Sequence, residues 1–299
     1  MVNPRFFALN DTLSGCPSVG QLLNFFKSAP RLRKIELDTA TLATGDQSGR
    51  LVSLACLKRM VIVWCSPSSI SLDHLLVPVG AKLKICGNSF RQIIEDRLPT
   101  HFDNLRNISG FTKIHFQINE NHTRMELCGP NGQLSMSSKG DAAHLGLGSL
   151  ARLDTSKVEQ LEVVSGDHSL DTRSSYRALL PLENLRTLTL SRCRDPYTFM
   201  AALGSNTGSS VVVACPKLEE IVLVPRTDTE GINIESVTKI AAARASRGTK
   251  LRTVRIVGGK DKLDPGDVLE LRKHVLNVEY DPVVDVVDSD SDDSDEDSW

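Results

Sequence analysis

Histidine and cysteine side chains are the groups that most often bind metals or act as nucleophiles, and this chain has seven of each. The histidines include no H-x-x-x-H or H-E-x-x-H pair, the spacing that puts two imidazoles on one helix face to hold zinc. The cysteines form no C-x-x-C pair, so neither a zinc site nor a disulfide framework is indicated. We therefore expect free thiols in a reducing compartment, and neither a metal nor a cofactor.

Three further patterns approach catalytic motifs without meeting their requirements. A nucleophile elbow, G-x-S-x-G, needs glycine two residues before and two residues after its serine, and Ser149 has neither. The glycine–lysine pairs at 80–82 and 248–250 lack the G-x-x-x-x-G-K-S/T spacing that cradles phosphate. Glu219 and Glu220 are neighbours on an expected strand, so they face opposite sides and cannot act as an acid–base pair. We predict that the protein is not an enzyme.

The elements that position these side chains follow a repeat. The leucine-rich consensus L-x-x-L-x-L-x-x-N/C-x-L is clearest in LENLRTLTLSRC, residues 182–193. Its x-L-x-L core predicts a short parallel strand that buries alternate residues. We expect the N/C position, occupied by Cys65, Asn119 and Cys193, to turn the chain with its side chain inward. Full or weaker copies start near residues 32, 57, 80, 111, 158, 185, 218, 251 and 275.

Apolar residues at helical spacing separate most of these strands, at 21–26, 174–180, 196–203, 234–247 and 265–274. The alternation predicts an α/β fold, an irregular leucine-rich-repeat solenoid with parallel strands on the concave face and helices on the convex face. Residues 1–20 would form an N-terminal lead-in or cap, residues 21–280 the leucine-rich-repeat domain, and residues 281–299 a disordered acidic tail.

The largest irregularity of the repeat lies at residues 111–148. Three alternating segments, at 113–118, 124–128 and 133–136, are joined by polar turns. We predict a β-meander inserted into the solenoid, followed by an exit loop rich in serine and glycine.

Composition and charge limit the class of protein. The 299 residues are 40% hydrophobic, enough for a sizeable core, and they contain neither a secretory signal nor a run of eighteen apolar residues. The net charge of −2 hides eight acidic residues in 285–299, which leave 35 basic against 29 acidic residues elsewhere. Because that basic excess is dispersed, we do not expect nucleic-acid binding. We expect a cytoplasmic and/or nuclear protein that does not associate with membranes.

Five stretches of the chain together resemble a known family. They are VSLACLKRMVIVWCSPSSISLDHLLVPVGAKLKI, SSYRALLPLENLRTLTLSRC, ACPKLEEIVLV, AAARASRGTKLRTVRIVGG and LELRKHVLNVEY. Over roughly residues 18–281 the chain looks like the leucine-rich-repeat region of F-box-type proteins of mushroom-forming (basidiomycete) fungi. The resemblance implies a substrate receptor, in which an F-box module docks on a Skp-type adaptor of a cullin ubiquitin ligase and the repeats present the substrate.

The chain departs from this family because no Leu-Pro-x-Glu-type F-box segment precedes the repeats. Two interpretations stay open. The chain is the substrate-recognition part of an F-box/cullin-type ligase system whose F-box has been lost or truncated, or it is a stand-alone scaffold without ligase function.

A protein partner of either kind would meet the residues between the buried strand positions. Binding hot spots favour arginine and aromatic residues, so Arg59 and Arg255 stand out. The alternatives are a plain solvated sheet, or recognition by loops around Trp64, Pro67 and 119–132. The candidate partner-binding residues on the concave face are Lys34, Glu36, Asp38, Arg59, Val61, His115, Glu162, Glu220 and Arg255.

The tail carries a separate binding hypothesis. Val283, Val284, Val286 and Val287 precede an acidic serine tract, a pattern that resembles a SUMO-interacting motif. Such a segment would add a strand to the edge of the partner's sheet. The alternative is an acidic tail that only solubilises the protein. Candidate phosphorylation sites are Ser289, Ser291 and Ser294.

Overall fold

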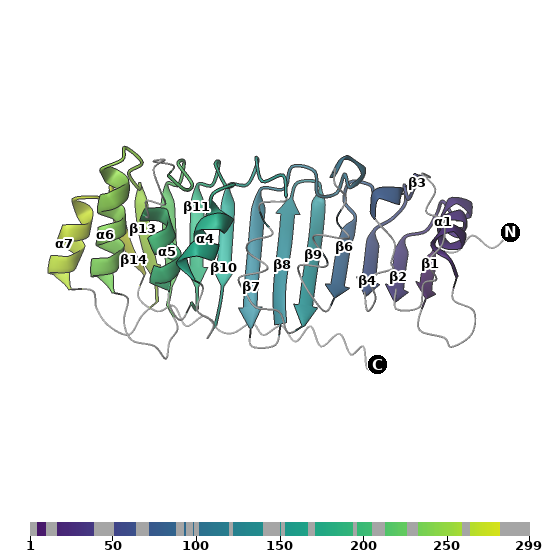
Figure 1. The fold of residues 1–299 in the computed structure, drawn as a ribbon, viewed down its shortest axis with the longest axis horizontal. Coiled ribbons are helices and arrows are strands. Elements are labelled where there is room, and N and C mark those ends of the chain that lie inside the picture. The colour runs from purple at the N-terminus through teal and green to yellow at the C-terminus, as the bar shows by residue number, and fades with distance from the viewer. Residues whose placement is uncertain are drawn as a thin grey trace.

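The computed structural model describes residues 5–9, 17–38, 51–63, 72–87, 93, 98, 102–119, 122–139, 150, 153–166, 171–193, 196–204, 213–225, 233–258 and 264–281. Within these residues the fold is α/β, with one large, mostly parallel sheet and five α-helices. Figure 1 shows an elongated molecule whose strands lie side by side in one row.

The large sheet has twelve strands. In spatial order they are β1 (Phe6–Leu9), β2 (Lys34–Asp38), β4 (Arg59–Val63), β6 (Lys82–Gly87), β9 (Gly132–Lys139), β8 (His122–Gly129), β7 (Lys113–Asn119), β10 (Gln160–Val164), β11 (Thr187–Ser191), β12 (Glu220–Val224), β13 (Thr253–Val257) and β14 (Asn277–Asp281). All neighbours are parallel except β7 with β8 and β8 with β9. Every predicted strand is present, and β1 is an additional one.

Most strands of the repeat enter the sheet through the same turn. For example, the amide of Leu185 donates to the carbonyl of Leu182, and the amide of Leu218 donates to that of Cys215. The strands then pair without offset, so equivalent apolar residues of successive repeats lie side by side. One such row is Leu161, Leu188, Ile221 and Val254. This stacking explains why the leucine spacing predicts the strands, since each leucine is buried against its counterparts.

The five α-helices are α1 (Val19–Ser28), α4 (Thr172–Leu179), α5 (Pro196–Gly204), α6 (Ile234–Ala245) and α7 (Pro265–Arg272). Polar side chains begin several of them: Asp171 accepts from the amide of Ser174, and Asn233 from that of Ser236. Helices α4 to α7 lie next to one another over the C-terminal strands (Figure 1). None of the helices in the described ranges is long and apolar enough to cross a membrane.

Towards the N-terminus, shorter elements take the place of these helices. Strands β3 (Val52–Ser53) and β5 (Leu75–Leu76) pair in parallel as a second, two-stranded sheet. At this edge of the large sheet, Phe7 of β1 packs on Phe25 of α1, with 4.6 Å between the ring centroids. The buried apolar residues of both halves form one continuous core.

The turn position of the repeat needs one correction. Cys193 is buried, with its Sγ 3.4 Å from the carbonyl oxygen of Ser191, as expected. Asn119, however, is exposed at the end of β7, so the prediction of an inward side chain is wrong there. Strand β7 runs straight on to pair with β8, and the alternation that buries Phe116 and Ile118 puts Asn119 on the other face. Cys65 lies outside the described residues.

Candidate functional site

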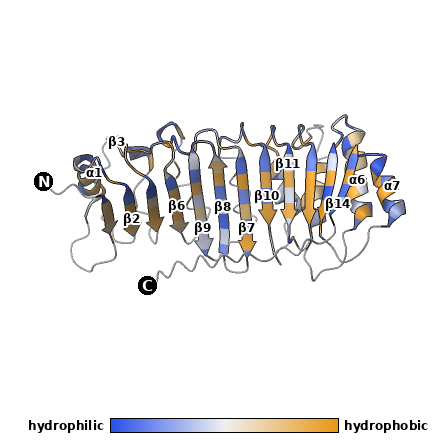
Figure 2. Ribbon diagram, turned by 180° about the vertical axis from the view of Figure 1, so that it is seen from behind, coloured by the Kyte–Doolittle hydropathy of each residue, from blue (hydrophilic) through white to orange (hydrophobic). Residues whose placement is uncertain are grey.

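One face of the large sheet packs against the helices, and the other carries half-exposed side chains from every second strand position. We call the second face the open face; Figure 2 views the molecule from behind relative to Figure 1. Because most strands pair without offset, the open-face residues form rows across the sheet. The middle row contains Glu36, Val61, Lys84, Ser135, Glu126, His115, Glu162, Thr189, Val222, Arg255 and Glu279.

The candidate partner-binding residues whose side chains the structure describes all lie in strand positions of the open face: Lys34, Glu36, Arg59, Val61, His115, Glu162, Glu220 and Arg255. The side chain of Asp38 lies outside the described part of the chain, as do the tail residues Val283, Val284, Val286, Val287, Ser289, Ser291 and Ser294. The eight residues do not form one cluster. Strands β4 and β12 are seven strand positions apart, which is about 34 Å at a spacing of about 4.8 Å.

The centre of the open face holds an ion-pair cluster on β7 and β10. His115 Nδ1 lies 3.1 Å from Glu162 Oε2, and Lys113 Nζ lies 3.2 Å from the same oxygen. Hydrogen bonds from His115 and then from Lys113 lower the pKa of Glu162 to about 2, against the opposing effect of its partial burial. Glu162 is therefore a carboxylate at physiological pH.

The two ends of the open face carry separate ion pairs. On β2, Lys34 Nζ lies 2.8 Å from Glu36 Oε1. Near the other edge, Arg255 Nε lies 2.7 Å from Glu279 Oε2, across β13 and β14. Exposed ion pairs of this kind contribute little to the stability of the fold. What they can provide is a pattern of charges on the open face for a partner to contact.

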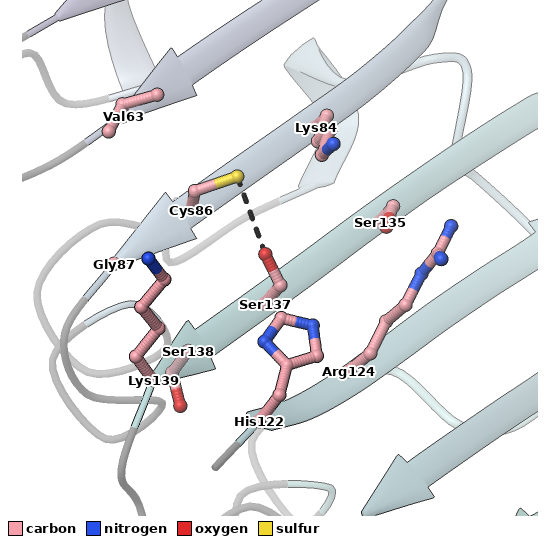
Figure 3. Close-up of a pocket in the computed structure, with 10 residues that line it drawn as sticks. All are labelled: Val63, Lys84, Cys86, Gly87, His122, Arg124, Ser135, Ser137, Ser138 and Lys139. Carbon is pink, nitrogen blue, oxygen red and sulfur yellow. Dashed lines mark hydrogen bonds between the residues drawn. The ribbon is translucent and has the colours of Figure 1, made fainter. Parts of the chain in front are cut away.

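Between these groups, the open face is hollowed over β6, β9 and β8, with a volume of about 400 Å³. Its floor is Ser135 and Ser137 of β9, each only 7% exposed although they are on the open face. The floor is low because serine side chains are short, whereas Lys84, Arg124 and Glu126 on the flanking strands are long. Lys84 of β6 is beside Ser135 in the register, and Arg124 of β8 is beside Ser137 (Figure 3). We call this feature the basic hollow.

Three cations surround the basic hollow: Lys84, Arg124 and Lys139. Burial lowers the pKa of His122, which lies among them, and the charges of Arg124, Lys139 and Lys84 lower it further. His122 is therefore a neutral imidazole at physiological pH, and it reports a positive potential at this point.

The basic hollow was not predicted from the sequence alone. One signal was present, since Ser135, Ser137 and Lys139 alternate on one strand and His122 and Arg124 alternate on its hairpin partner. Nothing in the sequence indicated that Lys84 would lie beside these residues. Its position depends on β6 pairing with β9, the third strand of the meander, and not with β7, which follows β6 in the chain.

No group of three or more His, Cys, Asp or Glu side chains in the described ranges is arranged to hold a metal ion. Comparisons of the chain with protein-family models, with curated proteins and with solved structures found no match. The resemblance to fungal F-box-type proteins therefore stays a prediction from the sequence.

Proposed function

We propose that the protein is a recognition module that binds a protein partner across the open face of its sheet. Twelve strands make this face about 50 Å long, and three rows of open-face residues make it about 15 Å wide. That area is close to the roughly 800 Å² that each partner contributes to a standard interface. The unshifted register, which joins the rows into one continuous surface, is the observation that carries the proposal.

In this proposal the fold is an irregular leucine-rich-repeat solenoid, and the open face is its concave side. The turn repeated before most of the strands and the alternation of strand and helix from β10 to β14 support this interpretation. The proposed role is binding and not catalysis, because a row of mixed charges can pair with complementary charges on a partner's surface.

A narrower role rests on the family resemblance alone. In it the chain is the substrate-recognition part of an F-box/cullin-type ubiquitin ligase in the cytoplasm or nucleus. The valine run at 283–287 supports a second candidate, a stand-alone scaffold whose tail binds SUMO. A peptide of residues 281–299 should then bind SUMO, and replacing its four motif valines by alanine should abolish that binding.

Affinity capture with the full chain tests the proposed role. The open-face variant Arg59→Glu/Arg255→Glu should lose a defined protein that the wild type captures. The control Lys239→Glu/Lys273→Glu reverses two exposed charges on the helix side and should still capture it. Equal capture by both variants would overturn recognition through the open face.

The same experiment tests the ligase role separately. A Skp-type adaptor is expected only if an F-box exists upstream of the repeats; it would then bind away from the open face and be recovered with all three proteins. If the partner is captured and no Skp-type adaptor accompanies it, the scaffold interpretation stands in place of the ligase one.

A further inference from the structure

We propose that the basic hollow is a binding site for a phosphate monoester group. Its cations come from three different strands: Lys84 from β6, Arg124 from β8 and Lys139 from the end of β9. None of the described residues that line it is acidic. Lys84 and Lys139 have no carboxylate partner among the residues that the structure describes, so their ammonium groups are available to a ligand.

The arrangement of these charges favours a phosphate monoester over a carboxylate. A carboxylate has one charge and two oxygens in a plane, whereas a phosphate monoester carries close to two charges and three terminal oxygens in a pyramid. Donors from three strands line the hollow, and a group with three terminal oxygens can accept from more of them than a carboxylate can. The three cations, less the one charge that Glu126 offsets, match its double charge.

The floor of the hollow offers a hydroxyl donor. Ser135 is 7% exposed and lines the hollow, and its Oγ has no hydrogen-bond partner among the described residues. A buried hydroxyl without a partner is costly, so a ligand oxygen that accepts from it would relieve that cost. Ser137 differs, because its Oγ already donates to Cys86 Sγ over 3.3 Å, as Figure 3 shows.

Arg124 is held in place by a neighbour outside the hollow. Its Nη2 lies 2.5 Å from Glu126 Oε1, two residues along the same strand. A guanidinium has five N–H donors and this contact uses one of them, so four are left for a phosphate. Glu126 offsets one positive charge, and Lys84 and Lys139 keep the hollow positive.

The size of the hollow sets what can carry the phosphate. About 400 Å³ is within the range of small-ligand sites and holds a phosphate together with part of the molecule attached to it. A phosphorylated side chain of a protein partner and a small phosphorylated compound share this chemistry. The first source rests on the proposed recognition role; the second does not.

His122 gives the test a direct readout. A bound dianion offsets the positive charges that lower the pKa of His122, so that pKa should rise on binding. The imidazole signals are followed by NMR in the full chain during titration with inorganic phosphate, a sugar phosphate and blocked phosphoserine. We expect a dissociation constant of about 1 mM or lower for at least one phosphate probe, and none for blocked serine.

Variants assign the binding to the hollow. Arg124→Gln and Lys139→Gln should each weaken binding about tenfold, because each removes a charged donor. Ser135→Ala should weaken it by a factor of about three to ten without a change in charge. Lys239→Gln, on the exposed side of α6, makes the same charge change elsewhere and should leave the affinity as it is.

Two results would overturn the site: no shift of His122 with any phosphate probe, or binding that survives Arg124→Gln and Lys139→Gln. Tighter binding of phosphoserine than of inorganic phosphate and sugar phosphate would support the site and identify a phosphorylated protein as the source. Tighter binding of sugar phosphate would support the site with a small ligand. Because these probes need no partner, the result stands apart from the capture experiment on the open face.

Discussion

Nδ1 of His115 donates a hydrogen bond to Oε2 of Glu162 on the neighbouring parallel strand, with 3.1 Å between the two atoms. This contact and the ammonium of Lys113 lower the pKa of Glu162 from its usual value near 4.5 to about 2. The folded protein therefore binds fewer protons at this carboxylate than the unfolded chain does between these two pH values. Its contribution to stability is complete above pH 4.5 and is lost as the pH falls towards 2.

We predict that Glu162→Gln lowers the stability of the protein by about 1–2 kcal/mol at neutral pH, after allowance for solvent screening. Thermal unfolding of wild type and variant between pH 7 and about pH 2 should give curves that converge at the acid end. Glu159→Gln is the control, because Glu159 is exposed in the turn before β10. A constant difference between wild type and Glu162→Gln down to pH 2 would contradict the assignment.

Arg244 gives a second prediction, because it is a fully buried cation at the end of α6. Its Nη1 and Nη2 donate to the carbonyls of Ala214 and Cys215, over 3.0 and 2.9 Å. Arg244→Met leaves both buried carbonyls without these donors and should cost about 2–4 kcal/mol in denaturant unfolding. Lys239→Met, exposed on the same helix, should change the free energy of unfolding by less than about 0.5 kcal/mol. Similar losses in the two variants would show that Arg244 has no special role.

The turn of the β8–β9 hairpin gives a third prediction, on stability. Gly132 has a φ of +141°, and an added Cβ would lie 2.9 Å from the carbonyl oxygen of Ala81 and 3.0 Å from that of Asn107. Gly132→Ala should therefore lose about 2–4 kcal/mol of stability, from backbone strain and from these contacts. At Gly80, φ is +82° and nothing lies within 4 Å, so Gly80→Ala should lose only about 1 kcal/mol, from strain alone. Denaturant unfolding that ranks the two variants in the opposite order would refute this account.

The cysteines give a fourth prediction. Cys56 is exposed, whereas Cys215 is buried and its burial raises the pKa of the thiol to about 12. In the native protein, iodoacetamide should label Cys56 readily, while Cys215 reacts at least about a thousandfold more slowly, because it is both protonated and inaccessible. Site-resolved mass spectrometry measures both rates in one sample. Fast labelling of Cys215 without loss of structure would be inconsistent with its burial.

Much of the sheet could be predicted from the sequence because one spacing recurs. At Leu185 and Leu218 the apolar spacing of the repeat begins at the same turn and continues into a strand. Strand β1 could not be found this way. Phe6–Leu9 lacks the preceding apolar positions of the repeat, and it is a strand because Phe7 packs on α1 and the chain pairs with β2.

The functional surface was only partly predictable. Period-two alternation correctly put His115, Glu162 and Arg255 on one face. It does not say which strands are neighbours, so neither the contact of His115 with Glu162 nor the basic hollow followed from it. Lys84 and Ser135 are 51 positions apart in the chain and meet because β9 is the meander strand that returns to β6.

The meander has a consequence for how such a protein can change in evolution. Strand β7 has the same direction as β6 and β10, and β8 and β9 lie between it and β6 as one hairpin. A deletion of that hairpin would let β7 pair directly with β6 without reversing any remaining strand, and it would shorten the sheet by about 10 Å. Since β8 and β9 also supply the floor and one wall of the basic hollow, a single insertion or deletion can add or remove a whole ligand site while the rest of the array is kept.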